Sequence, residues 1–153
     1  MLRVISDLNL CDRITKEYES GVATSGVAGM WVTVNASDKF DLTATSTATG
    51  ISYQIWNESN RDGTVGFTPD VAAIGKVTVL KGGYRALTDQ IESSAYTAAT
   101  VGAALMAGDD GLLVAAADTA AGAKATKAWV AKKHGSVTYL GTTFTNVIEI
   151  YVQ

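Results

Sequence analysis

The chain has 153 residues and a formal net charge of −3 at pH 7, with one cysteine, one histidine and one proline. This length fits a single domain with a substantial core. The acidic balance argues against nucleic-acid binding, which depends on lysine and arginine neutralising phosphates, and the lone Cys11 excludes an internal disulfide and a cysteine-based zinc site. Since no apolar run approaches the roughly 20 residues that span a bilayer, we expect a soluble protein made in a cytoplasm that binds neither nucleic acid nor membrane.

The composition favours strands. Threonine and valine, whose branched Cβ atoms suit a pleated sheet, are frequent, and fifteen glycines are present to supply turns. Charged residues make up 18% of the chain, which is below the typical quarter of a soluble domain. We therefore expect a β-rich protein whose surface is partly covered by other molecules, with a low-charge monomer as the alternative.

Residues 1–29 form the least regular part of the sequence. Leu10, Ile14 and Tyr18 recur at helical spacing, so one interpretation is a short helix and the other is an arm that becomes ordered only against a partner. Residues 22–29 have the composition of a loop. We therefore divide the chain into an N-terminal arm or irregular segment, residues 1–29, and a single β-rich domain, residues 30–153.

Three strand-like segments open the second part. Residues 30–34 are β-branched and aromatic, and residues 40–45 and 51–56 alternate apolar with polar side chains. Residues 57–66 form a polar loop, and Pro69 keeps the backbone around it out of any central ladder.

A glycine pair predicts the next turn. Gly82-Gly83 separates two strand-like runs within residues 76–87, which predicts a hairpin. The second run is ambiguous, because Leu87 and Ile91 are four residues apart and also fit one helical turn.

Residues 101–117, VGAALMAGDDGLLVAAA, predict another hairpin. Asp110-Gly111 stands between alternating apolar residues, and Gly tolerates the positive φ of a tight hairpin turn. With this pair at the centre, Ala107 faces Val114 and both faces of the hairpin are apolar. Such a hairpin needs cover on each side, from the rest of the protein or from another subunit.

The alanine-rich residues 115–134 fit two structures. Lys132, Lys133 and His134 followed by Gly135 satisfy the signals for the end of a helix. A strand that leads to a turn fits the same residues, and we favour the strand.

The C-terminal residues are less ambiguous. Gly141 separates two strand-like runs, residues 136–140 and 142–153. In the second run Ile148, Ile150 and Val152 share one face, and Glu149 and Tyr151 share the other.

Nothing in the sequence indicates catalysis. The only histidine, His134, lies between Lys133 and Gly135 without a nucleophile nearby in sequence, so we interpret it as a surface or cap residue. The chain has no G-x-S-x-G, H-E-x-x-H or P-loop signature. We therefore expect a protein that is not an enzyme and has no catalytic residue and no cofactor.

Acidic, aromatic and basic groups give three weaker candidates for a binding site. Two acidic loops offer oxygen ligands for calcium but lack further carboxylates, so we expect no metal. The tryptophans suit a core or a subunit interface better than a stacking platform, because arginines are not interleaved with them. The basic cluster is best interpreted as a solvated face. The residues concerned are Asp109 and Asp110; Glu58, Asn60 and Asp62; Trp31, Trp56 and Trp129; and Lys124, Lys127, Lys132, Lys133 and His134.

Two residue patterns near the C-terminus are similar to patterns in a known protein family. The first is a G-x-x-L…DG-x-L hairpin, and the second is a T-F-x-N-x-I-E-x-x-V run. Their residues here are Gly102, Leu105, Asp110, Gly111 and Leu113, then Thr143, Phe144, Asn146, Ile148, Glu149 and Val152. In these runs the last third of the chain resembles the head decoration, or cement, proteins of tailed bacteriophages.

The resemblance implies a mainly β fold: a compact antiparallel β-barrel or β-sandwich with at most one or two short helices and no active site. It implies a homo-oligomer, a trimer with a dimer as the alternative, that binds the major capsid protein on the outer surface of the virion and stabilises the shell. A phage tail-tube or tail-completion subunit is the alternative among structural proteins. A carbohydrate- or peptide-binding β-domain that uses the tryptophans is the alternative from another class.

Overall fold

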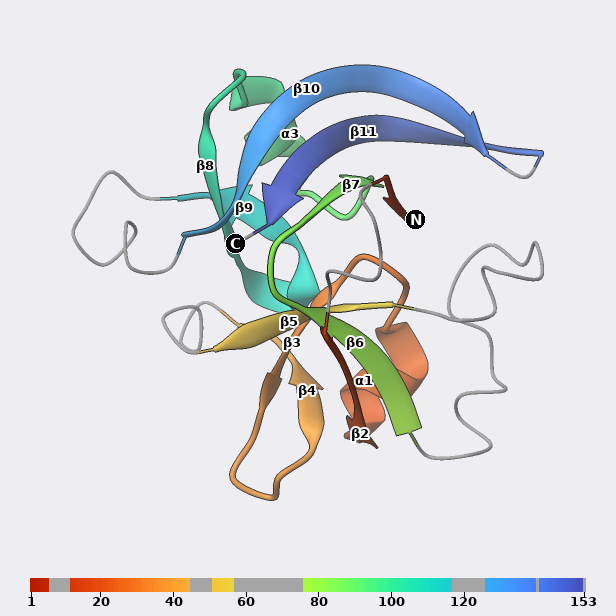
Figure 1. Cartoon of the computed structure of the whole chain (residues 1–153), viewed down its shortest axis with the longest axis vertical. Helices are drawn as coiled ribbons and strands as arrows, with labels where there is room; N and C mark the ends of the chain where they lie inside the picture. The colour runs from red at the N-terminus through yellow and green to blue at the C-terminus, as the bar shows by residue number, and fades with distance from the viewer. Residues whose placement is uncertain (6–11, 45–50, 57–75, 117–125, 140, 153) are drawn as a thin grey trace.

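The computed structural model describes residues 1–5, 12–44, 51–56, 76–116, 126–139 and 141–152, which fold into two antiparallel sheets (Figure 1). The six-stranded sheet forms the upper half in that view, with the order β1-β7-β11-β10-β8-β9. Its strands are β1 (Leu2–Val4), β7 (Tyr84–Thr88), β8 (Ala104–Ala107), β9 (Leu113–Ala115), β10 (Thr126–Tyr139) and β11 (Thr142–Val152).

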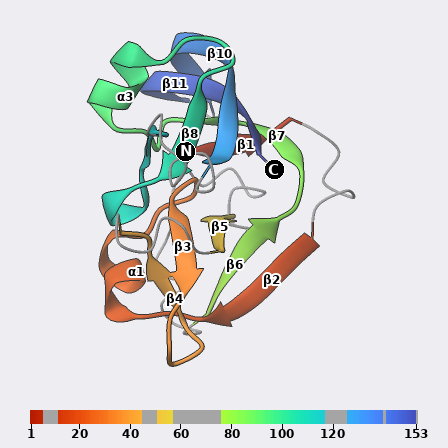
Figure 2. The same cartoon turned by 90° about the vertical axis from the view of Figure 1, so that its left-hand side faces the viewer.

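The five-stranded sheet forms the lower half and has the order β2-β6-β5-β3-β4 (Figure 2). Its strands are β2 (Asp12–Glu17), β3 (Trp31–Val34), β4 (Phe40–Leu42), β5 (Ser52–Ile55) and β6 (Lys76–Lys81). Two short helices, α1 (Ser20–Ser25) and α3 (Ser93–Ala98), accompany the sheets in the described part of the chain. The predicted mainly β fold is confirmed: the sheets pack together as a sandwich, without a closed barrel.

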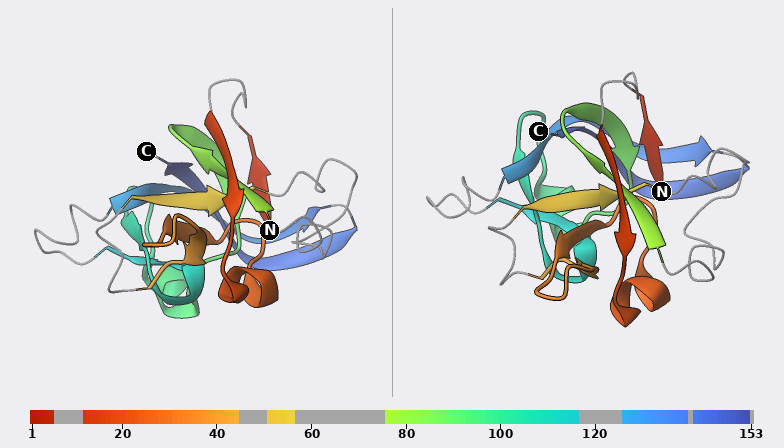
Figure 3. Two further views of the ribbon diagram at one scale, coloured as in Figure 1. Left: turned by 90° about the horizontal axis from the view of Figure 1, so that it is seen from below. Right: turned by 60° about the horizontal axis from the view of Figure 1, so that its bottom comes forward.

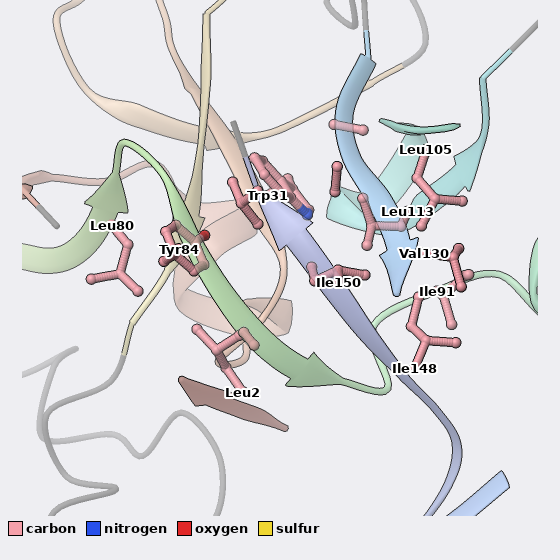
Figure 4. Close-up of a cluster of buried hydrophobic side chains, with 14 of the residues drawn as sticks. Leu2, Trp31, Leu80, Tyr84, Ile91, Leu105, Leu113, Val130, Ile148 and Ile150 are labelled. Atoms are coloured by element: carbon pink, nitrogen blue, oxygen red, sulfur yellow. The ribbon is translucent and has the colours of Figure 1, made fainter. Parts of the chain in front are cut away.

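The main core lies where the two sheets meet (Figure 4). Alternation along β11 turns Ile148 and Ile150 into this core, where both side chains are fully buried. Trp31 of β3 and Leu80 of β6 enter the same core from the other sheet. Because a buried side chain of this size stabilises the fold by about 1.5–3 kcal/mol, the shared core holds the two sheets together.

A smaller core lies within the five-stranded sheet, beneath α1. It contains Val22 of α1 and Phe40 of β4, both fully buried, and Phe40 contacts the ring of Tyr53 edge-on at 5.8 Å. A single bridge between Tyr18 and Phe40 also brings the end of β2 towards β4, so this sheet curls strongly.

Buried hydrogen bonds connect the sheets at two places, one around Tyr84 and Gln54 and the other at Thr43. The Tyr84 hydroxyl donates a hydrogen bond of 2.6 Å to Gln54 Oε1, and Gln54 Nε2 donates to the carbonyl of Gly29 at 2.8 Å. Thr43 Oγ1, which follows β4, donates to the carbonyl of Gly108 in the β8–β9 connection at 2.9 Å. Since an unsatisfied buried polar group is costly, these bonds favour one placement of the sheets over others.

The hairpin predicted over residues 76–87 is wrong. β6 pairs with β2 and β5, whereas β7 pairs with β1 and β11. The chain therefore crosses from one sheet to the other at Gly82-Gly83, where Gly82 has a φ of 95°, and Figure 2 shows β6 continuing into β7 through this bend. Glycine adopts the positive φ found at this corner as readily as that of a tight hairpin turn, so the glycine pair fits either.

The irregular arm predicted for residues 1–29 is also wrong for the part that the structure describes. β1 is an edge strand of the six-stranded sheet and pairs with β7, and β2 pairs with β6 along its whole length. The helical spacing around Ile14 does not produce a helix there, because the alternation of β2 matches its antiparallel partner. The expected loop over residues 22–29 contains most of α1.

The β8–β9 hairpin forms in a different register from the one predicted. Ala107 pairs with Leu113 instead of Val114. The connection contains a short 3₁₀ turn, η4 (Asp109–Gly111), in which both Asp110 and Gly111 have positive φ, 54° and 72°. A change of register by one residue moves each side chain of one strand to the opposite face.

This register makes only one face of the β8–β9 hairpin a core face. Leu105, Ala107 and Leu113 are buried there, whereas Met106 and Val114 lie partly exposed on the other face. The structure therefore fully covers one face of the hairpin, the core face, and leaves the other face partly exposed.

The strand favoured for the alanine-rich segment is confirmed where the structure describes it. β9 ends at residue 115 and β10 begins at residue 126, and residues 117–125 lie outside the described part. The last two predicted strands are confirmed too, in β10 and β11.

Candidate interaction surface

The outer half of the β10–β11 hairpin extends beyond the sheet. β10 pairs with β8 only between residues 126 and 129, and β11 pairs with β7 only from residue 148 onward. Residues 135–139 and 142–147 therefore form a two-stranded ribbon with no other described strand at either edge, and Figure 3 shows its tip at the periphery of the molecule. We call these residues the distal ribbon.

One side of the distal ribbon packs against the molecule. Its half-buried side chains Val137, Tyr139 and Phe144 contact a small cluster that contains Leu87 of β7 and Val147 of β11. The guanidinium of Arg3 on β1 also lies 5.3 Å from the centre of the Tyr139 ring. These contacts matter because a two-stranded ribbon is only marginally stable in water without packing.

The other side of the distal ribbon is polar and exposed. The hydroxyls of Thr138 and Thr143 lie 3.1 Å apart across the two strands. Further exposed positions on the ribbon are Ser136, Thr142 and Thr145. The ribbon thus offers backbone edges and hydroxyls to another molecule, without charged side chains.

The ribbon bends where its pairing is irregular. Three register shifts lie between Val130 and Val137, and Gly135 has a φ of 73°. On the facing strand, Asn146 has a φ of 55° next to Val147, the partner of Gly135. β-bulges of this kind increase bending and twist, which accounts for the arch of β10 and β11 in Figure 1.

A buried carboxylate lies at the start of this bend. Glu149 on β11 is 5% exposed and accepts hydrogen bonds from Arg85 on β7 and from His134 on β10, the latter at 3.1 Å. Burial raises the pKa of Glu149, but the bonds and charges of His134 and Arg85 together outweigh it and lower that pKa below its usual value. Glu149 is therefore ionised at neutral pH and links three strands.

Of the two interpretations of His134, a surface or a cap residue, the cap is wrong. The residue lies in the middle of β10, in the bulged stretch between Lys133 and Gly135. Gly135 is compatible with a helix end and with a β-bulge, because glycine with a positive φ is common in both. The ring of His134 faces Glu149, with Nε2 3.1 Å from Oε2.

An aromatic and basic row crosses the same sheet closer to its middle. Trp129 of β10 pairs directly with Tyr151 of β11, and Tyr151 pairs with Arg85 of β7. The Arg85 guanidinium lies 5.3 Å from the centre of the Tyr151 ring, and Tyr151 is 49% exposed. The sequence pattern indicated that Glu149 and Tyr151 share a face, but it gave no signal for Arg85 or His134.

The chain matches no family model, no curated protein and no solved structure.

The three tryptophans do not form one platform. Trp31 and Trp56 are buried in the main core, with 2% and 6% exposure, and the guanidinium of Arg13 lies 4.4 Å from the centre of the Trp56 ring. Trp129 alone among them is partly exposed. A flat sugar-binding surface built from several tryptophans is therefore not assembled.

The acidic and basic candidates are dispersed. Asp109 and Asp110 lie exposed in η4, and the described residues contain no group of three or more His, Cys, Asp or Glu side chains that could hold a metal ion. Lys132 is exposed, whereas Lys133 turns towards α3 and lies 4.5 Å from the centre of the Tyr96 ring. The remaining candidates, Cys11, Glu58, Asn60, Asp62 and Lys124, lie outside the described residues.

A shallow polar hollow opens on the five-stranded sheet. Its volume is about 300 Å³, and it lies between β2 and the β3–β4 turn. Lys16 and Lys39 line it but are each paired with a carboxylate, Asp38 and Glu17 respectively. These ion pairs offset much of the positive charge in the hollow. Separately, none of the helices in the described residues has the length and hydropathy needed to cross a membrane.

Proposed function

We propose that this protein is a structural virion protein, which binds the outer surface of a phage capsid and stabilises the assembled shell without catalysing a reaction. Its partner is the major capsid protein, and it is made in the host cytoplasm and acts as a homo-oligomer on the virion. The resemblance of the last third of the chain to decoration proteins supports this function, as does the mainly β fold.

The observation that carries the proposal is the distal ribbon. It lies at the periphery, has free strand edges in the described part and exposes hydroxyls without charges. Free edges are suited to pairing with a strand of another protein. A protein that contacts neighbouring capsid subunits binds the assembled lattice more tightly than free subunits, so by linkage its binding favours the intact shell.

Binding to undecorated capsids tests the proposal. Purified protein is added to capsids assembled from the co-encoded major capsid protein, and co-sedimentation and the capsid disruption temperature are measured. We expect saturable binding and a higher disruption temperature. If the wild-type protein neither binds nor raises that temperature, the proposed function is wrong.

A matched pair of variants tests the role of the ribbon. Thr138→Lys/Thr143→Glu replaces an exposed cross-strand threonine pair on the ribbon, and Thr15→Lys/Thr78→Glu replaces the equivalent pair on the five-stranded sheet, where the hydroxyls lie 2.9 Å apart. Each change leaves the net charge unaltered and places opposite charges across two strands, which a sheet tolerates. We expect only the ribbon variant to lose capsid binding, and equal binding by both would refute the ribbon as the contact.

The free ribbon edges also favour a second candidate, a tail-tube or tail-completion subunit, because edges that pair from one subunit to the next can close a ring. Electron microscopy of the purified protein distinguishes the two. Rings or tubes would support the tail assignment, whereas small discrete oligomers would support the decoration protein.

A further inference from the structure

We infer that the outer face of the six-stranded sheet, around Trp129, Tyr151 and Arg85, is the surface on which a second copy of this chain docks. The outer face is the side of the sheet that points away from the five-stranded sheet and α3. The inference rests on the homo-oligomer in the proposed function and assigns a surface to it.

Alternation along the central strands identifies the outer face. Ala128 and Val130 of β10 enter the main core, so Trp129 between them points the opposite way. Ile150 and Val152 of β11 likewise enter the core and leave Tyr151 on the outer side. The two aromatic side chains are therefore direct cross-strand neighbours on that side.

The inner side of the same sheet already has cover. Ala95 and Ala99, from α3 and its C-terminal end, belong to the main core, together with Trp31 and Leu80 of the five-stranded sheet. At the level of Trp129 no described helix or second sheet lies over the outer face, where Tyr151 remains 49% exposed.

The residue types on the outer face are those of a protein interface. Tryptophan, tyrosine and arginine are enriched at the centres of interfaces and dominate their binding energies. The Arg85 side chain is 45% exposed although it also binds Glu149, so its position is fixed before any partner arrives. A side chain that is already ordered, such as that of Arg85, loses less entropy on binding. Met106 and Val114 add partly exposed apolar area to the outer face on β8 and β9.

Charge identifies the occupant. In the described part the strand register places three cations and one carboxylate on the outer face, and that carboxylate, Glu149, is buried. This balance gives the face +2, so the rest of a chain with a net charge of −3 carries −5. A second copy is therefore an acidic partner for this face, and complementary charge accelerates and orients association. The three cations are Arg3, Arg85 and Lys132.

The acidic surface lies elsewhere on the chain, so the contact joins two different patches. Asp109 and Asp110 in η4 form an exposed acidic pair in the β8–β9 connection, and we assign them to the docking side. A contact between unlike patches is head-to-tail, and it closes into a ring when the rotation allows it. A cyclic oligomer such as a trimer is the closed form of this arrangement.

The test measures self-association by analytical ultracentrifugation across a range of protein and salt concentrations. Lys132→Glu changes the charge of the outer face, and Lys81→Glu makes the same change at an exposed position on β6, in the other sheet. Tyr151→Ser removes the exposed ring, and Asp109→Asn/Asp110→Asn removes the acidic pair while retaining a residue type that tolerates positive φ. Circular dichroism and thermal unfolding confirm that each variant is folded.

We expect the wild-type protein to form a discrete oligomer that weakens as salt is raised. Lys132→Glu, Tyr151→Ser and the aspartate double variant should each raise the dissociation constant about fivefold or more, as for interface hot spots, while Lys81→Glu changes it less than about twofold. A wild-type monomer, or an oligomer equally sensitive to Lys81→Glu and Lys132→Glu, would overturn the inference. Loss of capsid binding by Lys132→Glu with an intact oligomer would also overturn it, by assigning the face to the capsid, whereas failure of the wild type to bind capsids tests only the proposed function.

Discussion

Replacing Tyr84 with phenylalanine removes one buried hydroxyl that connects the two sheets. The Tyr84 ring is 4% exposed, and its hydroxyl donates to Gln54 Oε1 at 2.6 Å. Gln54 is completely buried, and its Nε2 is already bound to the carbonyl of Gly29. Without the hydroxyl, Oε1 loses this donor in a place where water does not replace it. Rotating the side-chain amide of Gln54 by 180° would instead leave the Gly29 carbonyl without its hydrogen-bond donor.

The expected cost of Tyr84→Phe is about 1–3 kcal/mol, which is the usual penalty for leaving a buried acceptor unsatisfied. For a domain of this size each kcal/mol lowers Tm by about 2–4 °C, so a cost of about 2 kcal/mol corresponds to a decrease of about 4–8 °C. Urea unfolding followed by circular dichroism should show a lower midpoint with an unchanged m-value.

Tyr151→Phe is the matched control, since the same atom is removed from a side chain that is 49% exposed. Its effect should remain within about 0.5 kcal/mol. The double variant Tyr84→Phe/Gln54→Leu should cost less than the sum of its two single changes, because both remove the same bond. If Tyr84→Phe is as mild as the control, the hydroxyl does not contribute to sheet placement.

Three further outcomes are expected. Because the folded-state pKa of Glu149 is lowered, its ionised carboxylate contributes to folding stability above the unfolded pKa, and this contribution is lost as pH falls through the lower folded pKa. The free energy of unfolding of Glu149→Gln, measured by urea titration, should therefore fall less between pH 6 and pH 3 than that of the wild type. Gly111→Ala should destabilise more than Gly141→Ala in thermal unfolding, since both have positive φ but only the Gly111 Cβ would clash, at 2.8 Å from a backbone oxygen of β3; equal losses would leave only backbone strain as the cause. Thr43→Val removes a buried donor from a carbonyl in the β8–β9 connection and should cost about 1–3 kcal/mol, which a urea midpoint equal to wild type would contradict.

Local patterns were sufficient to predict most strands but not their partners. The alternation of residues 147–152 predicts β11 and its buried face, because strand periodicity is written within a few residues. Gly82-Gly83 shows the limit: the bend is encoded locally, but whether the next strand turns back or enters another sheet depends on partners far away in sequence. β1 is similar, since its three residues become a strand only by pairing with β7.

The candidate surface was predictable only in part, for the same reason. Glu149 and Tyr151 were assigned to one face from the sequence, and the structure places both on the outer side of β11. Arg85 joins them from a strand 64 residues earlier, and no short-range pattern encodes that proximity. His134 joins them because a bulge turns its ring towards Glu149, and a single inserted residue of this kind leaves no periodic signal.

The strand order has a consequence for how the molecule is built during translation. The two central strands of the larger sheet, β10 and β11, are synthesised after both of their flanking neighbours, β7 and β8. Until the β10–β11 hairpin leaves the ribosome, β7 and β8 lack the two strands that lie between them in the sheet, and the sheet cannot cover its side of the main core. Insertion of β10 and β11 between β7 and β8 thus completes the larger sheet, and a nascent chain that has not reached this step exposes unpaired strand edges, which favour aggregation.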